Sequence, residues 1–161
     1  MPWVLSTGAD SYDIYSEGGI KALTLAKDLV DSGAMSKECI NWTQGDVMNQ
    51  FISGNVAMMI NGPWQIPTMQ QEAPDLNWNV ALIPKDAEYA SCLGGENYAV
   101  IKDGNEEGAL DFLEYATEQE QVEYLMDAFG YISADKTIAE SQFADDPVMQ
   151  TFTEELNYAK A

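Results

Sequence analysis

The tetrapeptide Asn61-Gly62-Pro63-Trp64 is the stretch of this sequence best suited to meet a ligand. It follows an apolar run, 56–60, which we expect to form a short buried strand. The glycine and the proline should end that strand, because glycine adopts unusual dihedral angles and proline lacks an N–H donor. Trp64 would then stand before a short helix predicted for 66–72, where its ring face could contact a ligand. The alternative is a tryptophan that packs in the core or anchors that helix.

A second glycine-containing stretch, Gly94-Gly95-Glu96-Asn97, interrupts an extended apolar pattern. Paired glycines within such a pattern indicate a bulge or a place where another molecule approaches the backbone closely. An ordinary hairpin turn is the alternative. Glu96 can accept hydrogen bonds through its carboxylate, and Asn97 can both donate and accept them.

The charge balance restricts the kind of ligand. The 161 residues, enough for one domain, include 27 acidic side chains against seven lysines, with no arginine, and the formal net charge is −20. Nucleic acid and anionic lipid surfaces are therefore poor partners, since both require a basic field. Without arginine there is no bidentate clamp for a carboxylate or phosphate. The composition favours a neutral ligand.

The residue types also exclude most familiar catalysis. The chain has no histidine, so neither a Ser–His nor a Cys–His dyad can form, and we expect no metal and no cofactor. Cys39 and Cys92 lack metal-site spacing; they could form a disulfide or be two unrelated thiols. No apolar run approaches the roughly 20 residues of a membrane span. Met1-Pro2 resembles an engineered start, so we expect any targeting sequence to lie outside this chain.

Helical periodicity and helix-end signals predict a largely helical chain with apolar stripes. Ser16 should begin a helix that ends before Gly33, and Thr43 should begin another, with Asp46 completing a capping box. Further helices are expected from Asn105, from Glu118 to Gly130, from Asp135 to Glu140, and from Asp146 with Pro147 at its first position. Extended segments are expected at 12–15, 56–60, 78–83, 90–93 and 98–101.

Three segments occur in an order that, taken together, is specific. The first is 51–64, an aromatic-x-x-Gly-x-x-Ala-Met pattern ending in Gly-Pro-Trp; the second is Pro84, a spacer and then 94–97. The third is the helix pair 107–129 followed by Gly130-Tyr131. From about residue 16 onward the sequence thus resembles the extracellular solute-binding proteins of ABC sugar importers, the maltose-binding-like family. It departs from the family at Ser133, where a proline is usual.

The resemblance implies an α/β fold, a periplasmic-binding-protein-like lobe with a short mixed sheet flanked by several helices. Residues 1–161 would form a single domain, most of the C-terminal lobe of a two-lobe protein, with the N-terminal lobe and the C-terminal tail outside this chain. It further implies an extracytoplasmic location, as a cell-surface lipoprotein or in the periplasm.

The implied function is to capture a neutral mono- or oligosaccharide and deliver it to the membrane permease, as a monomer and without catalysis. Trp64 would be the platform for the apolar face of a sugar ring. Hydrogen-bonding and backbone contacts would come from the other candidates: Glu96, Asn97, Gly94, Gly95 and, in lesser roles, Asn61 and Tyr131. Two alternatives remain: an acidic glycoside-processing enzyme that pairs Glu96 with a second carboxylate, and a non-catalytic interaction module.

Overall fold

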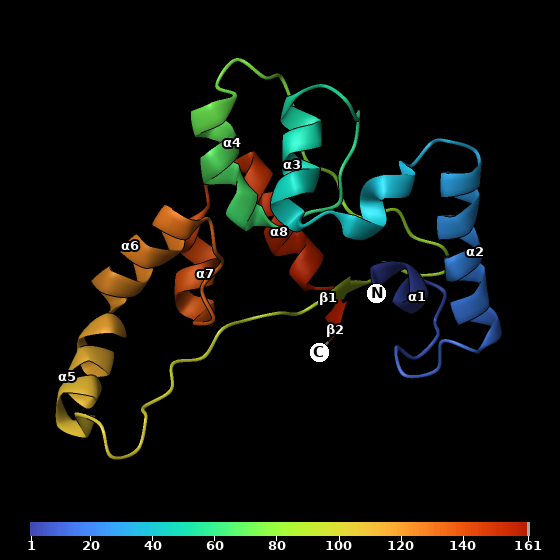
Figure 1. Ribbon diagram of the computed structural model, residues 1–161. Coiled ribbons are helices and arrows are strands. Elements are labelled where there is room, and N and C mark those ends of the chain that lie inside the picture. Colours follow the sequence, from blue (N-terminus) through green and yellow to red (C-terminus); the bar gives the residue numbers. More distant parts are fainter. Residues whose placement is uncertain (161) are drawn as a thin grey trace.

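The computed structural model describes residues 1–160, a mostly helical chain with one small parallel sheet (Figure 1). This arrangement agrees with the expected α/β class. The elements, in chain order, are α1 Pro2–Ser6, α2 Glu17–Asp31, the 3-10 helix η1 Lys37–Asn41, α3 Gln44–Ile52, the 3-10 helix η2 Pro63–Gln65, α4 Ile66–Glu72, β1 Ser91–Cys92, α5 Glu106–Ala116, α6 Gln119–Phe129, α7 Lys136–Gln142, α8 Pro147–Leu156 and β2 Ala159–Lys160.

The predicted helix starts are confirmed by side chains that accept backbone N–H groups. The Ser16 hydroxyl accepts from the Gly19 N–H at 3.2 Å, and this contact begins α2. Thr43 and Asp46 form the expected reciprocal capping box at the start of α3. The bonds from Thr43 also hold the pKa of the Asp46 carboxyl below its usual range, because they stabilise the carboxylate. The predicted caps at Asn105 and Asp146 are likewise present, and Asp135, where a short helix was expected to begin, caps α7.

Most of the predicted strands are wrong. Within 90–93 only β1 forms, and it pairs in parallel with β2, which the sequence analysis missed. The segments 12–15, 56–60, 78–83 and 98–101 are not strands, because no neighbouring segment supplies a ladder for them. The run 56–60 is not buried either: Met58 is 87% exposed. Apolar and β-branched residues favour a strand only where a partner edge is available.

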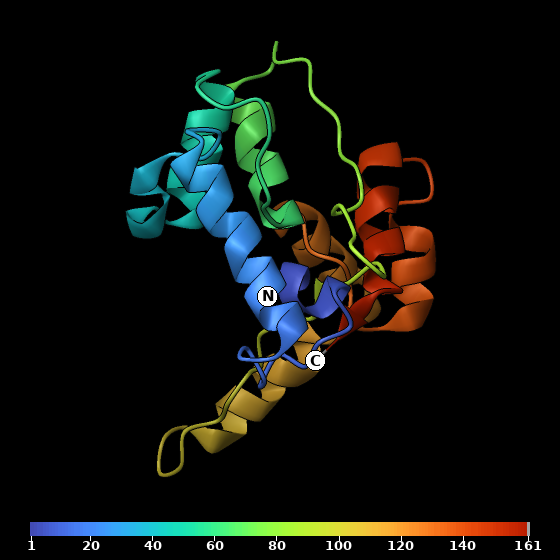
Figure 2. The ribbon, with the colours of Figure 1, turned by 90° about the vertical axis from the view of Figure 1, so that its right-hand side faces the viewer.

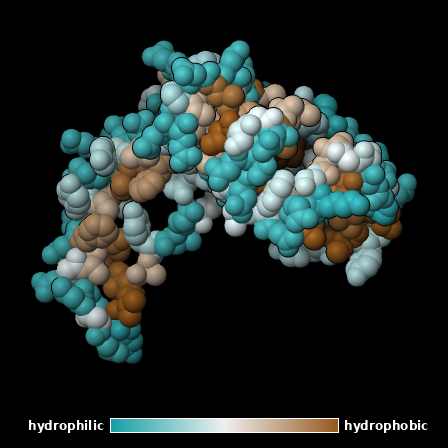
Figure 3. All heavy atoms as spheres, turned by 45° about the horizontal axis from the view of Figure 1, so that its top comes forward, coloured by the Kyte–Doolittle hydropathy of each residue, from teal (hydrophilic) through white to brown (hydrophobic). Residues whose placement is uncertain are grey.

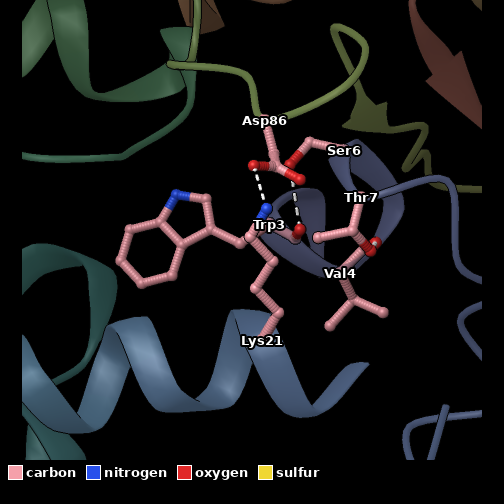
Figure 4. Close-up of polar contacts among 6 residues, drawn as sticks. All are labelled: Trp3, Val4, Ser6, Thr7, Lys21 and Asp86. Atoms are coloured by element: carbon pink, nitrogen blue, oxygen red, sulfur yellow. Dashed lines mark hydrogen bonds and ion pairs between the residues drawn. The ribbon is translucent and has the colours of Figure 1, made fainter. Parts of the chain in front are cut away.

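The N-terminal helix α1 joins α2 to the loop that precedes β1. The Ser6 carbonyl accepts from the N–H groups of Ala87 and Glu88, at 2.9 and 3.0 Å. Figure 4 shows the Lys21 ammonium of α2 beside the Asp86 carboxylate, 2.6 Å apart, and the Ser6 hydroxyl donating to the Trp3 carbonyl. The sequence analysis did not predict α1. The buried apolar residues of the chain are Val4, Leu5, Ala22, Met48, Ile66, Met69, Ala90, Ala116, Ile138 and Met149.

Helices α5 and α6 form an arm that projects from the rest of the molecule in Figure 1, and α5 also projects in the turned view of Figure 2. Apolar side chains lie on the surface of this arm (Figure 3), among them Leu110 and Phe112 of α5. The expected inward-facing stripes are thus incomplete, and Leu25 of α2 and Leu156 of α8 are also exposed. The accessible surface is 11469 Å². A compact chain of this mass exposes about 8,000 Å², so much apolar surface here is uncovered.

Candidate functional site

The candidate site is the corner where the chain turns from an extended segment into η2 and α4. The Trp64 ring lies directly over Gly62: a Cβ atom at position 62 would stand 2.1 Å from the Cη2 atom of the indole. Only glycine therefore permits this ring position. Pro63 is the first residue of η2, where its missing N–H is not needed. Pro67 sits in the first turn of α4, as the sequence predicted.

Gln44, the first residue of α3, connects this corner to a second helix. Its side-chain Oε1 accepts from the Trp64 indole N–H at 3.1 Å, and its backbone carbonyl accepts from the Asn61 Nδ2 at 2.9 Å. Asn61 also accepts, through Oδ1, from the Gly62 N–H at 3.0 Å. Sequence reasoning missed Gln44 because no local pattern relates it to a tryptophan 20 residues later.

Tyr131 lies beside Trp64, and the two rings meet edge to face with their centroids 6.2 Å apart. Phe129 stacks with Tyr131, with their ring centroids 6.0 Å apart and their planes 30° apart. Trp64, Tyr131 and Phe129, which we call the aromatic row, thus come from two segments far apart in the sequence. Such ring pairs are the preferred geometries of aromatic side chains.

The turn at Gly130 brings the aromatic row together. Gly130 ends α6 in the left-handed region with φ of 67°, as the sequence predicted for a helix stop. A Cβ atom there would lie 2.8 Å from the Pro63 carbonyl oxygen and 3.0 Å from the Pro67 Cδ. The backbone of Gly130 therefore rests directly on the Trp64 corner, and this close approach determines where Tyr131 points.

The second predicted group lies apart from the first. Gly94, Gly95, Glu96 and Asn97 are all exposed, and a Cβ atom on either glycine would meet nothing within 4 Å. Figure 1 shows this segment leaving β1 as extended chain toward α5. Across residues 1–160, no hydrogen bond or ring contact joins it to the aromatic row. The structure thus brings Trp64, Asn61 and Tyr131 together and leaves the other four candidates separate.

The exposure of Trp64 bears on how its ring can be used. The residue is 39% exposed, so it is not a core tryptophan, although its hydrogen bond and ring contacts hold it in place. An aromatic ring that is both fixed and accessible can bind an apolar ligand face with little loss of side-chain entropy. Two shallow hollows elsewhere, of about 120 and 190 Å³, contain no residue of the aromatic row.

One buried carboxyl lies outside the candidate site. Glu155 of α8 is 9% exposed; its Oε2 accepts from the Ile83 N–H at 3.3 Å, and its buried Oε1 has no hydrogen-bond partner in the part of the chain described. Burial raises the pKa of this carboxyl, the bond from Ile83 opposes that effect, and the neighbouring Glu154 charge adds to it. Glu155 therefore joins α8 to the segment before β1 at an electrostatic cost.

Residues 1–160 were also compared with the requirements of a metal site, a disulfide and a membrane-spanning helix. No group of three or more His, Cys, Asp or Glu side chains is arranged to hold a metal ion there. The two cysteines, Cys39 and Cys92, are free thiols and not a disulfide. None of the helices in that range is both long and apolar enough to span a membrane.

Comparison with known proteins identifies the family of this chain. Over 102 residues it is 34% identical to binding proteins of Brucella abortus (strain 2308) and Brucella suis biovar 1 (strain 1330), whose names state no ligand. The matched region is 60% of this chain and 25% of each relative, so the chain spans about a quarter of the length of these curated relatives. The family of bacterial extracellular solute-binding proteins matches over residues 1–151. This match covers most of the sequence, and the chain therefore belongs to that family.

Proposed function

We propose that this chain is a carbohydrate-binding lobe of an extracytoplasmic solute-binding protein that captures a neutral mono- or oligosaccharide and delivers it to an ABC permease. The observation that carries the proposal is the Trp64 ring, fixed over Gly62 by Gln44 and Tyr131 and still 39% exposed. A sugar ring has an apolar C–H face and a rim of hydroxyl groups. An immobilised indole beside amide groups is complementary to both.

The charge of the chain supports a neutral ligand. With a net charge of −20 and no arginine, an anionic solute would be repelled and would find no guanidinium to bind. Four of the seven lysines are engaged away from the corner: Lys21, Lys27 and Lys160 pair with carboxylates, and Lys85 lies over the Tyr89 ring. An uncharged saccharide fits this charge balance.

We propose further that the whole protein has two lobes and that this chain is most of the C-terminal one. Two observations support this: the relatives are about four times longer than the matched region, and the α5 arm exposes apolar side chains that a compact domain would cover. In this proposal Gly94, Gly95, Glu96 and Asn97 take up their ligand-binding positions only in the two-lobe protein, where contacts from outside this chain fix the segment and the lobes close on the ligand by a hinge motion. The protein would be a monomer, either lipid-anchored or periplasmic.

The activity would be binding without reaction. A glycoside-processing enzyme needs two carboxyl groups about 5 to 10 Å apart on either side of the sugar bond. Incubation of the full-length protein with oligosaccharides, followed by chromatography, tests this point. We expect the sugars to be recovered intact, and released products would favour the enzyme.

A titration of the full-length protein with neutral oligosaccharides tests the platform itself. Trp64→Ala should lower the affinity for the best-binding saccharide at least tenfold, as measured by calorimetry, because the stacking surface is removed. Trp78→Ala is the matched control, since this half-buried tryptophan has no ring contact or hydrogen bond with the corner in residues 1–160, and the variant should bind the saccharide as tightly as the wild type does. Equal affinities of the wild type and Trp64→Ala would refute the assignment of Trp64.

A further inference from the structure

The side-chain amide of Gln44 has an orientation that chemistry fixes. An indole N–H can only donate, so the amide atom 3.1 Å from Trp64 Nε1 must be the oxygen. The Nε2 group, which carries two N–H donors, therefore points away from the indole N–H. In residues 1–160 it donates to no protein acceptor, and Gln44 is exposed.

Asn61, which the sequence had suggested as a contact, is used differently. Its Nδ2 donates to the Gln44 carbonyl, and its Oδ1 accepts from the Gly62 N–H. Both ends of this amide are thus engaged in holding the corner to α3. The second N–H of Asn61 Nδ2 faces the Met59 Sδ at 3.8 Å, and Asn61 is half-buried, whereas Gln44 is exposed and its Nε2 can donate without losing any contact.

Gln44 is also held in place before a ligand arrives. It is the first residue of α3, directly after the Thr43 capping box, and its side chain is tied at Oε1. Helices α3 and α4 lie side by side in both ribbon views (Figures 1 and 2). A donor that is already ordered loses little entropy on binding, so its hydrogen bonds contribute more to affinity.

We propose that Gln44 is a specificity-determining residue, whose Nε2 donates to a ring oxygen or hydroxyl of the saccharide at the edge of the Trp64 platform, while Asn61 positions the corner. This inference rests on the proposed function, because it names a further contact of the same site. Amide donors beside an aromatic face can hydrogen-bond to the acceptor oxygens of a neutral, polyhydroxylated ligand and so distinguish one such ligand from another.

The test uses the full-length protein and the substitution Gln44→Glu. A carboxylate of the same length still accepts from the indole N–H but donates nothing, so the ring should stay in place while the ligand contact is lost. We expect the affinity for the best-binding saccharide to fall about tenfold or more in calorimetry, with the tryptophan emission of the unliganded protein unchanged. Gln44→Met, which removes the indole bond as well, should change both the affinity and the emission.

The control is Gln50→Glu, the same change on the same helix. Gln50 also uses Oε1 as an acceptor, from the Asn55 Nδ2 at 3.0 Å, and it lies about 9 Å further along α3. The Gln50→Glu variant should bind the saccharide with the affinity of the wild type. This result would exclude the added negative charge as the sole cause of the loss in Gln44→Glu. Affinities for a set of monodeoxy sugars provide a second readout. The wild type should bind one of them more weakly than the parent sugar, and Gln44→Glu should bind the two equally.

The outcomes separate the two proposals. If Trp64→Ala weakens binding but Gln44→Glu binds as the wild type does, Gln44 only positions the ring, and this inference is wrong while the proposed function stands. If the wild type binds no saccharide in the panel, the proposed function fails and this assignment fails with it.

Discussion

The corner at 61–65 and the segment at 94–97 look alike in the sequence, but they differ in the structure. Each contains glycine at a break in an extended apolar pattern. At the corner a Cβ on Gly62 would strike the Trp64 ring, whereas a Cβ on Gly94 or Gly95 would meet open space. The corner is therefore shaped by contacts within this chain. The conformation of the other segment is not determined by any packing that involves its glycines.

The largest effect is expected from Gly130→Ala. This residue has a positive φ, and a methyl group would press against the Pro63 carbonyl oxygen at 2.8 Å. The free energy of unfolding should fall by more than about 1 kcal/mol, and the Tyr131 ring should move away from Trp64. Chemical denaturation and tryptophan emission measure the two effects.

Two controls define the cause of that loss. Gly33→Ala has a similar positive φ of 78° but no atom within 4 Å, so it should show the backbone strain without the clash. Gly95→Ala should change stability by less than about 0.5 kcal/mol. If Gly95→Ala cost as much as Gly130→Ala, the distinction between the two regions would be wrong.

Gly62→Ala should act mainly on the site. The methyl group would displace the indole, which should break the hydrogen bond to Gln44 and change the Trp64 emission. In the full-length protein we expect about a tenfold loss of saccharide affinity. Gly94→Ala should leave the unliganded emission unchanged, and a shift of equal size in both variants would contradict the contacts described.

Thr43→Ala should cost about 1 kcal/mol, because it removes the cap of α3. Since Gln44 is the next residue, hydrogen exchange should become faster at the start of α3 and in the corner, while the 94–97 segment should exchange as before. Thr151→Ala on α8 is a comparison in which a threonine hydroxyl without a cap role is lost. If Thr43→Ala made hydrogen exchange faster only at 94–97, the proposed coupling between the α3 cap and the corner would be wrong.

The smallest effect concerns pH and Glu155. Its pKa is raised in the folded state, so the folded state holds this proton more tightly than the unfolded chain does. The contribution to stability is therefore complete below the ordinary glutamate pKa and is lost as the pH rises through the raised value. Glu155→Gln should lack this loss, so the stability difference between wild type and variant should grow in favour of the variant as the pH rises from 4 to 7. A difference that stays constant over this range would rule the effect out.

Local signals were sufficient for the helices and for part of the site. Ser16, Thr43 and Gly130 act on backbone groups a few residues away, so their patterns are readable in the sequence. The strands were not predictable in this way, because the pairing of Ser91 with Ala159 joins segments that are far apart in the sequence. For the same reason the sequence indicated Trp64 but not its partner Gln44, and it could not show that 94–97 lies apart from the corner.

The close approach of Gly130 to Pro63 has a consequence for engineering. A minimal sugar sensor built by grafting residues 61–65 onto another scaffold would lack the backbone against which that turn is seated. The graft would have to include 129–131 and Gln44 as well as 61–65, because these three segments hold one another in position.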